Sequence, residues 1–204
     1  MEYRDPETGG HIKRTKNYVR ILAKKLQENP KYKPILTDEM IDNLYKSAPL
    51  HDIGKIGIRD EVLLKTTKLT DEEFAEMQTH AQIGYDALRQ ASQKLGENSF
   101  LQNAMILSKY HHEKWNGKGY PDHIAGESIP LAGRIMAISD VYDALISQRV
   151  YKRAYTHEEA VKIIREESGK HFDPELVEAF LAVSDQFDEI ARIFSDANEP
   201  FASN

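Results

Sequence analysis

The chain contains no cysteine among its 204 residues. Disulfide bonds, thiolate metal ligands and a thiol nucleophile are therefore excluded. A metal site in this protein must be built from histidine, aspartate and glutamate side chains, which bind metals through nitrogen and oxygen.

The sequence also lacks a long apolar run and an excess of positive charge. No stretch approaches the roughly 20 apolar residues of a membrane-spanning helix, and residues 1–5 do not resemble the start of a signal peptide. We therefore expect a cytoplasmic protein without a membrane span. The formal net charge of −6 argues against a duplex nucleic acid partner, which requires a basic face, but it allows a small anionic ligand held by a few local cations.

Hydrophobic residues make up 40% of the chain and charged residues 29%, as in ordinary globular proteins. Apolar residues recur at helical spacing, and prolines or capping residues separate these segments. We predict one all-α domain over residues 1–204, with its core at about 5–184 and a frayed tail from about 196. The expected helices cover about 10–29, 38–51, 71–88, 99–112, 130–147, 157 onward and 173–184.

Two pairs of potential metal ligands stand where helices are expected to end. His51 and Asp52 precede a glycine, and His111 and His112 precede a glycine-rich loop at 113–129. A loop of this length in a small domain more often has a function than not. Neighbouring residues of a helix differ by about 100° around its axis, so His111 and His112 serve adjacent ions better than one ion.

Three further candidates lie on helix faces that are expected to be apolar. Asp140 belongs to a helix with two apolar faces, so its buried carboxylate needs a cation or several hydrogen-bond donors. A salt bridge to Arg134 or Arg149 would serve equally well. His11 and His80 also lie on apolar faces, where a hydrogen-bonded core histidine is the simpler explanation. The remaining histidines are expected at the surface or in packing: His123, His157 and His171.

The number of candidates indicates more than one ion. A single octahedral ion takes about six ligands, and a hydrolytic site leaves positions open for water. Seven protein ligands therefore imply at least two ions, with Asp52 as a bridge between them. Glu7 could add a third ion, or it could be a solvated residue before the first helix. The seven candidates are His11, His51, Asp52, His80, His111, His112 and Asp140.

Two adjacent metal ions favour hydrolysis of a phosphate ester, because they activate a water and stabilise the charge that develops on phosphorus. Lys55, one helical turn after the His-Asp pair, is expected to bind a phosphate oxygen or to protonate the leaving oxygen. Arg149 and Lys152 could hold a second phosphate, and Tyr120 could bind a phosphate or stack on a base. Trp115 is better explained by core packing. The sequence has no phosphate-binding loop, serine nucleophile elbow or zinc-protease helix motif.

The ordered motifs of the chain resemble the HD-GYP family, a branch of the HD phosphohydrolase superfamily. They lie at residues 51–58, 111–121, 129–131, 139–145 and 149–152, and the resemblance covers about residues 5–182. It implies an HD-type helical bundle that hydrolyses bacterial cyclic di-GMP to pGpG, often onward to GMP. It also implies iron or manganese in a centre of two or three metals.

The resemblance assigns roles to individual residues. Asp52 and Lys55 match the catalytic positions, with metal-bridging hydroxide as the nucleophile. Lys55, Tyr120, Arg149 and Lys152 match substrate contacts. The implied metal ligands are Glu7, His11, His51, Asp52, His80, His111, His112 and Asp140. Four other positions depart from the usual pattern and leave the substrate preference open, namely Arg59, Asn116, Lys118 and Val150.

Two alternatives remain at this point. The same chemistry could act on another dinucleotide, such as cyclic GMP-AMP or a linear dinucleotide. The chain could instead be a catalytically silent module that docks a diguanylate cyclase (GGDEF) domain through the Tyr120 loop. The complete ligand set favours catalysis. Family members commonly carry an upstream regulatory domain, so we expect this chain to be a catalytic domain excised from a longer regulated protein.

Overall fold

The structure is a computed structural model that describes residues 9–96, 98–147 and 154–195. Within these ranges the regular elements are helices, and no β-strand is present. The α-helices are α1 (Gly9–Gln27), α2 (Asp38–Ser47), α3 (Asp60–Leu63), α4 (Asp71–Gln78), α5 (His80–Leu95), α6 (Ser99–Tyr110), α7 (Leu131–Ile146), α8 (His157–Glu166), α9 (Pro174–Leu181) and α10 (Ser184–Ile193). Three short 3-10 helices are η1 (Ala48–Leu50), η2 (Ile53–Gly57) and η3 (Gly126–Ser128).

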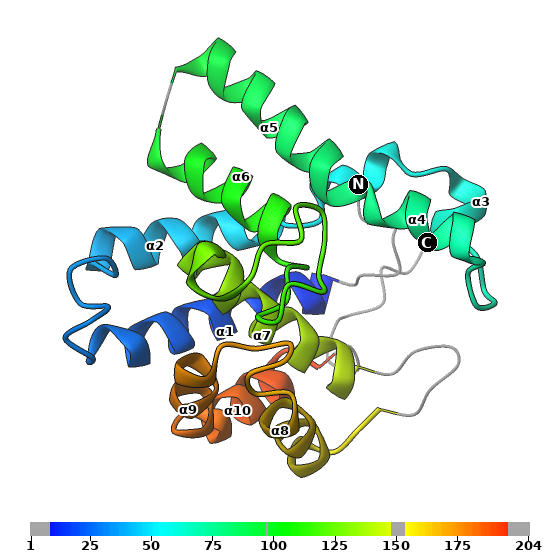
Figure 1. Ribbon diagram of the computed structural model, residues 1–204. Coiled ribbons are helices and arrows are strands. Elements are labelled where there is room, and N and C mark those ends of the chain that lie inside the picture. Colours follow the sequence, from blue (N-terminus) through cyan, green and yellow to red (C-terminus); the bar gives the residue numbers. More distant parts are fainter. Residues whose placement is uncertain (1–8, 97, 148–153, 196–204) are drawn as a thin grey trace, which may run out of the picture.

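The helices form two packed groups around the long helices α1 and α7. Helices α5 and α6 run side by side as a hairpin on one side, and α8, α9 and α10 gather on the other (Figure 1). The main core includes Tyr18 and Leu22 of α1, Ile135 and Tyr142 of α7, and Phe187 of α10. A smaller apolar cluster, Leu88, Leu101 and Ala104, lies between α5 and α6. In the described part of the chain, no helix has the length and apolar character needed to cross a membrane.

Capping residues start several helices where the sequence predicts. The Thr37 side chain accepts a hydrogen bond from the Met40 amide at the start of α2. Thr70 and Thr156 each form a capping box, at α4 and α8. Such caps satisfy amide groups that the first helical turn leaves without partners.

The structure departs from the predicted helices in three places. The helix expected from residue 71 to 88 breaks at Thr79, whose hydroxyl donates to the Glu76 carbonyl at 2.6 Å. Phe74, expected on an apolar face, is 49% exposed, because α4 buries none of its residues. Helices α3 and α10 were not expected at all, although α10 buries Phe187 against Tyr18 with ring centroids 4.5 Å apart.

Candidate metal centre

Seven of the eight predicted metal ligands lie in the described residues, and these seven come together in two adjoining groups. Within each group, one nitrogen or oxygen atom from every residue lies within 4.8 Å of the others. We call them the four-residue cluster (Asp52, His80, His111 and His112) and the three-residue cluster (His11, His51 and Asp140). They meet where His51 Nε2 lies 3.0 Å from Asp52 Oδ2.

Close backbone packing brings the His51-Asp52 pair against α5. A Cβ atom on Gly54 would lie 1.9 Å from the His80 carbonyl oxygen and 2.4 Å from the Gly84 amide nitrogen. Only glycine allows the 3-10 helix η2 to approach α5 this closely. Asp52 Oδ1 consequently lies 3.1 Å from His80 Nε2.

Main-chain carbonyls fix the orientation of three histidine rings. The Nδ1 atoms of His51, His80 and His111 lie 2.8, 2.7 and 2.9 Å from the carbonyl oxygens of Ala48, Met77 and Leu107. A carbonyl only accepts hydrogen bonds, so each Nδ1 carries the proton and donates. Each Nε2 then presents a lone pair, which is the arrangement that metal-binding histidines adopt.

These lone pairs converge on one buried point beside Asp52. His80 Nε2 lies 3.5 Å from His111 Nε2, and both nitrogens face Asp52 Oδ1, which accepts no hydrogen bond among the described residues. Electron-rich atoms at these separations repel one another unless a metal ion or a proton lies among them. Burial lowers the pKa of His111 and, to a greater extent, of His112, so protons are disfavoured. The nitrogen and oxygen donors therefore fit a divalent metal ion.

Asp52 stays ionised in this buried position. Burial opposes ionisation, but the Lys55 ammonium group, 2.8 Å away, favours the charged form and helps to hold the Asp52 pKa well below its usual range. Its two oxygens face different groups, with Oδ1 toward the four-residue cluster and Oδ2 toward His51 and Lys55. A carboxylate placed in this way is suited to bridge two metal ions, as the sequence predicts.

The Asp140 carboxylate faces the other two members of the three-residue cluster, His11 and His51, rather than the arginine Arg134. Its Oδ1 lies 3.9 Å from His11 Nε2 and 3.8 Å from His51 Nε2. Arg134, one of its two possible partners, pairs instead with Asp173 at 2.6 Å. Arg149, the other, lies outside the described residues.

Sequence reasoning missed the residues that hold His11. Asp143 Oδ2 accepts a hydrogen bond from His11 Nδ1 at 2.9 Å. Arg14 in turn donates two hydrogen bonds to Asp143, from Nε to Oδ1 at 2.6 Å and from one terminal nitrogen to Oδ2 at 2.9 Å. Asp143 is 1% exposed and Arg14 is 3% exposed. Burial opposes ionisation of Asp143, but His11 and Arg14 lower its pKa below the usual range.

The predicted substrate contacts that the structure describes lie beside the four-residue cluster. Lys55 Nζ is 2.8 Å from Asp52 Oδ2. The Tyr120 ring stacks against His112 at 4.7 Å between centroids, and burial raises the Tyr120 pKa. Glu7, Arg149 and Lys152 lie outside the described residues, so the structure does not place these three predicted residues.

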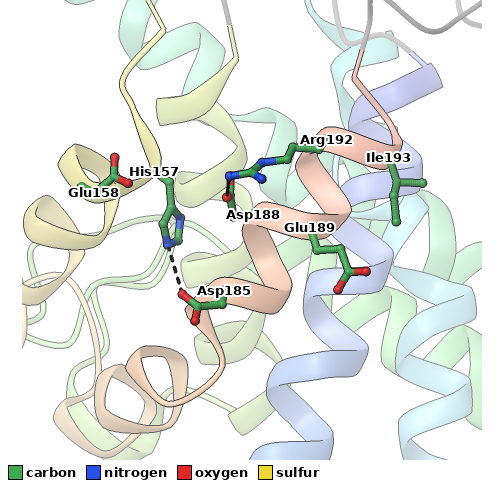
Figure 2. Close-up of a pocket in the computed structure, with 7 residues that line it drawn as sticks. All are labelled: His157, Glu158, Asp185, Asp188, Glu189, Arg192 and Ile193. Atoms are coloured by element: carbon green, nitrogen blue, oxygen red, sulfur yellow. Dashed lines mark hydrogen bonds and ion pairs between the residues drawn. The ribbon is translucent and has the colours of Figure 1, made fainter.

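A separate hollow lies between α8 and α10 (Figure 2). An ion pair joins Asp188 to Arg192, and His157 Nε2 lies 3.9 Å from Asp185 Oδ1. The side chains that line the hollow are His157, Glu158, Asp185, Asp188, Glu189, Arg192 and Ile193. They share no residue with either metal cluster, and they form a mixed acidic and basic surface.

Several known proteins that resemble this chain are named as phosphodiesterases of cyclic dinucleotides. Residues 4–176 match the HD domain family. A cyclic di-GMP phosphodiesterase of Vibrio cholerae is 58% identical over 196 residues, which is 96% of this chain and 40% of that protein. A probable cyclic di-GMP phosphodiesterase of the same organism is 50% identical over 196 residues, covering 96% of this chain and 44% of that protein. This chain therefore spans less than half the length of either relative.

A solved structure supports the all-α fold. The crystal structure of a cyclic GMP-AMP specific phosphodiesterase of V. cholerae superposes with a TM-score of 0.54 at 19% identity. The match covers 91% of this chain and 52% of that one. Together with the two His-Asp clusters, these matches show that the chain belongs to the HD domain family, in its HD-GYP branch.

Proposed function

We propose that this protein is a metal-dependent phosphodiesterase that hydrolyses cyclic di-GMP to pGpG, and onward to GMP. The observation that carries the proposal is the convergence of seven histidine and aspartate side chains in two adjoining clusters, with Asp52 between them. The names of the two V. cholerae relatives support cyclic di-GMP as the substrate.

The four-residue cluster and the three-residue cluster would each hold one ion, of iron or manganese. Glu7 is proposed as a ligand of a third ion. Such ions activate water for attack on phosphorus and offset the negative charge of the transition state. The chain contributes neutral imidazoles with fixed rings and an ionised Asp52, so little reorganisation is needed when metal binds.

Lys55 supplies a positive charge next to the bridging carboxylate. Its side chain is 19% exposed, so the ammonium group is sheltered and also accessible to a ligand. We assign it to a phosphate oxygen of the substrate or to the leaving oxygen, where a positive charge stabilises the transition state. Tyr120 is placed to stack on a base or to donate to a phosphate, and Arg149 and Lys152 are proposed to hold the second phosphate.

A second candidate substrate is cyclic GMP-AMP, which the name of the V. cholerae crystal structure specifies for that enzyme. Docking of a GGDEF domain by the Tyr120 loop is a third possibility, and it does not require catalysis. The seven ligands that converge in the structure favour catalysis, because a binding module has no need to retain them.

The decisive experiment is an anaerobic hydrolysis assay with cyclic di-GMP and added Fe(II) or Mn(II), with products separated by chromatography. Anaerobic conditions matter because iron is redox-active. We expect pGpG or GMP from the wild-type protein and neither from Asp52→Ala. If metal-loaded protein cleaves cyclic GMP-AMP and not cyclic di-GMP, the substrate assignment is wrong. If it cleaves no dinucleotide, the binding-module alternative replaces the enzyme.

The role of Lys55 is tested by Lys55→Ala in the same assay. We expect kcat to fall by about 10²–10³, the typical cost of losing one preorganised electrostatic group, while metal content stays at the wild-type level. Lys46→Ala is a matched control, since Lys46 also pairs with an aspartate, Asp42, but at the surface. Loss of metal in Lys55→Ala would show that the lysine supports the metal centre instead of the substrate.

A further inference from the structure

The loop that carries Tyr120 is folded against the four-residue cluster. The Tyr120 amide donates to the His112 carbonyl at 3.2 Å, and its ring covers the His112 imidazole. Gly119 permits this fold, because a Cβ atom there would lie 2.3 Å from the Lys114 amide nitrogen. The position of Tyr120 therefore depends on how the rest of the loop is held.

The first residues of the same loop are attached to the connection between α8 and α9, which we call the 167–173 turn. The Trp115 amide donates to the His171 carbonyl at 2.9 Å, and the Asn116 amide donates to the Lys170 carbonyl at 2.9 Å. The turn is closed by a bond of 2.8 Å from the Gly169 amide to the Phe172 carbonyl. Two main-chain hydrogen bonds therefore join the loop to the C-terminal helices.

A largely buried ion pair reinforces this attachment. Arg134 of α7 donates to Asp173 Oδ2 at 2.6 Å, and its guanidinium group lies 5.9 Å from the centre of the Trp115 ring. The side chains of Arg134 and Asp173 are 10% and 2% exposed. The other oxygen of Asp173 caps α9 by accepting from the Glu175 amide at 2.9 Å. Hydrogen bonds between charged groups are shorter and stronger than those between neutral groups.

The 167–173 turn also lies within the electrostatic reach of the metal centre. Burial and the nearby Lys114 charge lower the His171 pKa to about 4, although the Asp140 carboxylate partly opposes them. The same turn thus contacts the loop through its main chain, and the charge of Asp140, a predicted metal ligand on α7, acts on its His171 side chain.

We propose that Arg134 and Asp173 are positioning residues for substrate binding, which tie α7, the 167–173 turn and Trp115 into one unit and thereby hold Tyr120 over the site. The proposal rests on the function proposed above, since it takes Tyr120 as a substrate contact. Neither residue touches the metal clusters, so their loss affects the binding of substrate more than the binding of metal.

Trp115 provides a readout that does not depend on activity. It is the single tryptophan of the chain, so its fluorescence reports on this loop alone. We expect Arg134→Gln to shift the emission to the red and to increase quenching by acrylamide. We expect KM for cyclic di-GMP to rise about tenfold, with kcat within about twofold and metal content unchanged. Arg134→Lys, which keeps the charge, should fall between Arg134→Gln and the wild type.

Two further variants control for misfolding and for effects that do not involve the loop. Asp173→Ser removes the carboxylate, and serine is still able to cap α9, so this variant tests the ion pair even if Arg134→Gln does not fold. Arg20→Gln is the matched control. Arg20 of α1 lies 3.6 Å from the ring centre of Tyr45 of α2, so it makes a similar contact with an aromatic ring outside the loop. It should leave KM and Trp115 emission unchanged.

The proposal is overturned if Arg134→Gln and Asp173→Ser both keep wild-type emission, or if emission shifts while KM stays the same. It is equally overturned if kcat and metal content fall while KM is kept, since Arg134 would then support α7. Failure of the proposed function looks different. In that case the wild-type protein itself does not hydrolyse cyclic di-GMP, and the fluorescence result still decides whether the ion pair holds the loop.

Discussion

The two metal clusters differ in one respect, which is how the ring of His11 is held. In the four-residue cluster, His80 and His111 donate to carbonyl oxygens three or four residues earlier in the chain. In the three-residue cluster, His51 is held locally by the Ala48 carbonyl, but His11 donates to Asp143, which is 132 residues away on α7 and is held by Arg14. The first arrangement is local, and the second exists only after α1 and α7 have packed together.

The difference determines how each cluster can be damaged. A main-chain carbonyl is present whatever the side chain, so no single substitution removes the acceptor of His80. The ion pair behind His11 can be removed by one substitution, and its loss leaves a buried charge without its partner, which costs about 3–5 kcal/mol. We therefore expect the three-residue cluster to respond to side-chain changes and the four-residue cluster to respond mainly to changes in backbone packing.

Asp52→Ala removes the carboxylate between the clusters and should have the largest effect. We expect metal to be lost from both clusters, with turnover reduced about 10³-fold or more, because the metal ions contribute several kcal/mol to catalysis. Metal analysis by mass spectrometry and the hydrolysis assay measure the two effects. Asp71→Ala, at an exposed aspartate, is the control. Loss of metal from one cluster alone would mean that Asp52 does not bridge.

Gly54→Ala should disturb the four-residue cluster through the backbone. The new Cβ would clash with main-chain atoms of His80 and Gly84, so we expect the free energy of unfolding to fall by about 3 kcal/mol or more. Gly57→Ala in the same 3-10 helix is the matched control, because the atoms nearest its Cβ belong to the flexible side chain of Ile83, the first at 2.9 Å. Thermal unfolding and metal analysis compare the two variants. Equal behaviour of the two would refute the role of the close approach.

The helical fold could be predicted from apolar spacing and capping residues, but the break at Thr79 could not. No proline or glycine marks it. The Thr79 hydroxyl and the His80 ring both bind carbonyl oxygens of the preceding turn, at Glu76 and Met77. His80 adopts this geometry at the metal centre, so tertiary structure overrides a continuous helical pattern.

The ligand candidates could be predicted because histidine and aspartate are unusual on apolar helix faces. Asp143 and Arg14 were not predicted, because they hold His11 only as a pair and the pair forms only when α1 and α7 pack together. One signal was present, since Arg14 follows His11 by three residues and Asp143 follows Asp140 by three. The members of each pair lie on the same face of their helix. When a face with histidine and arginine packs against a face with two aspartates, a carboxylate is placed to hold the histidine ring.

Asp143→Asn provides the most selective test of the comparison. The neutral amide accepts more weakly from His11 Nδ1, so we expect the metal dissociation constant of the three-residue cluster to rise about 10- to 100-fold. The four-residue cluster should keep its metal. Calorimetric titration of metal into chelator-treated protein would show one weakened class of site and one unchanged class.

The single variant also leaves the buried Arg14 without its anionic partner, so lower stability alone would not identify the cause. The double variant Asp143→Asn with Arg14→Gln removes that charge and should regain thermal stability without regaining metal affinity, because His11 still lacks its carboxylate. Recovery of both properties would show that Asp143 acts only as the counter-ion of Arg14. Unchanged metal affinity in the single variant would show that His11 does not need a charged acceptor, and the two clusters would then be equivalent in this respect.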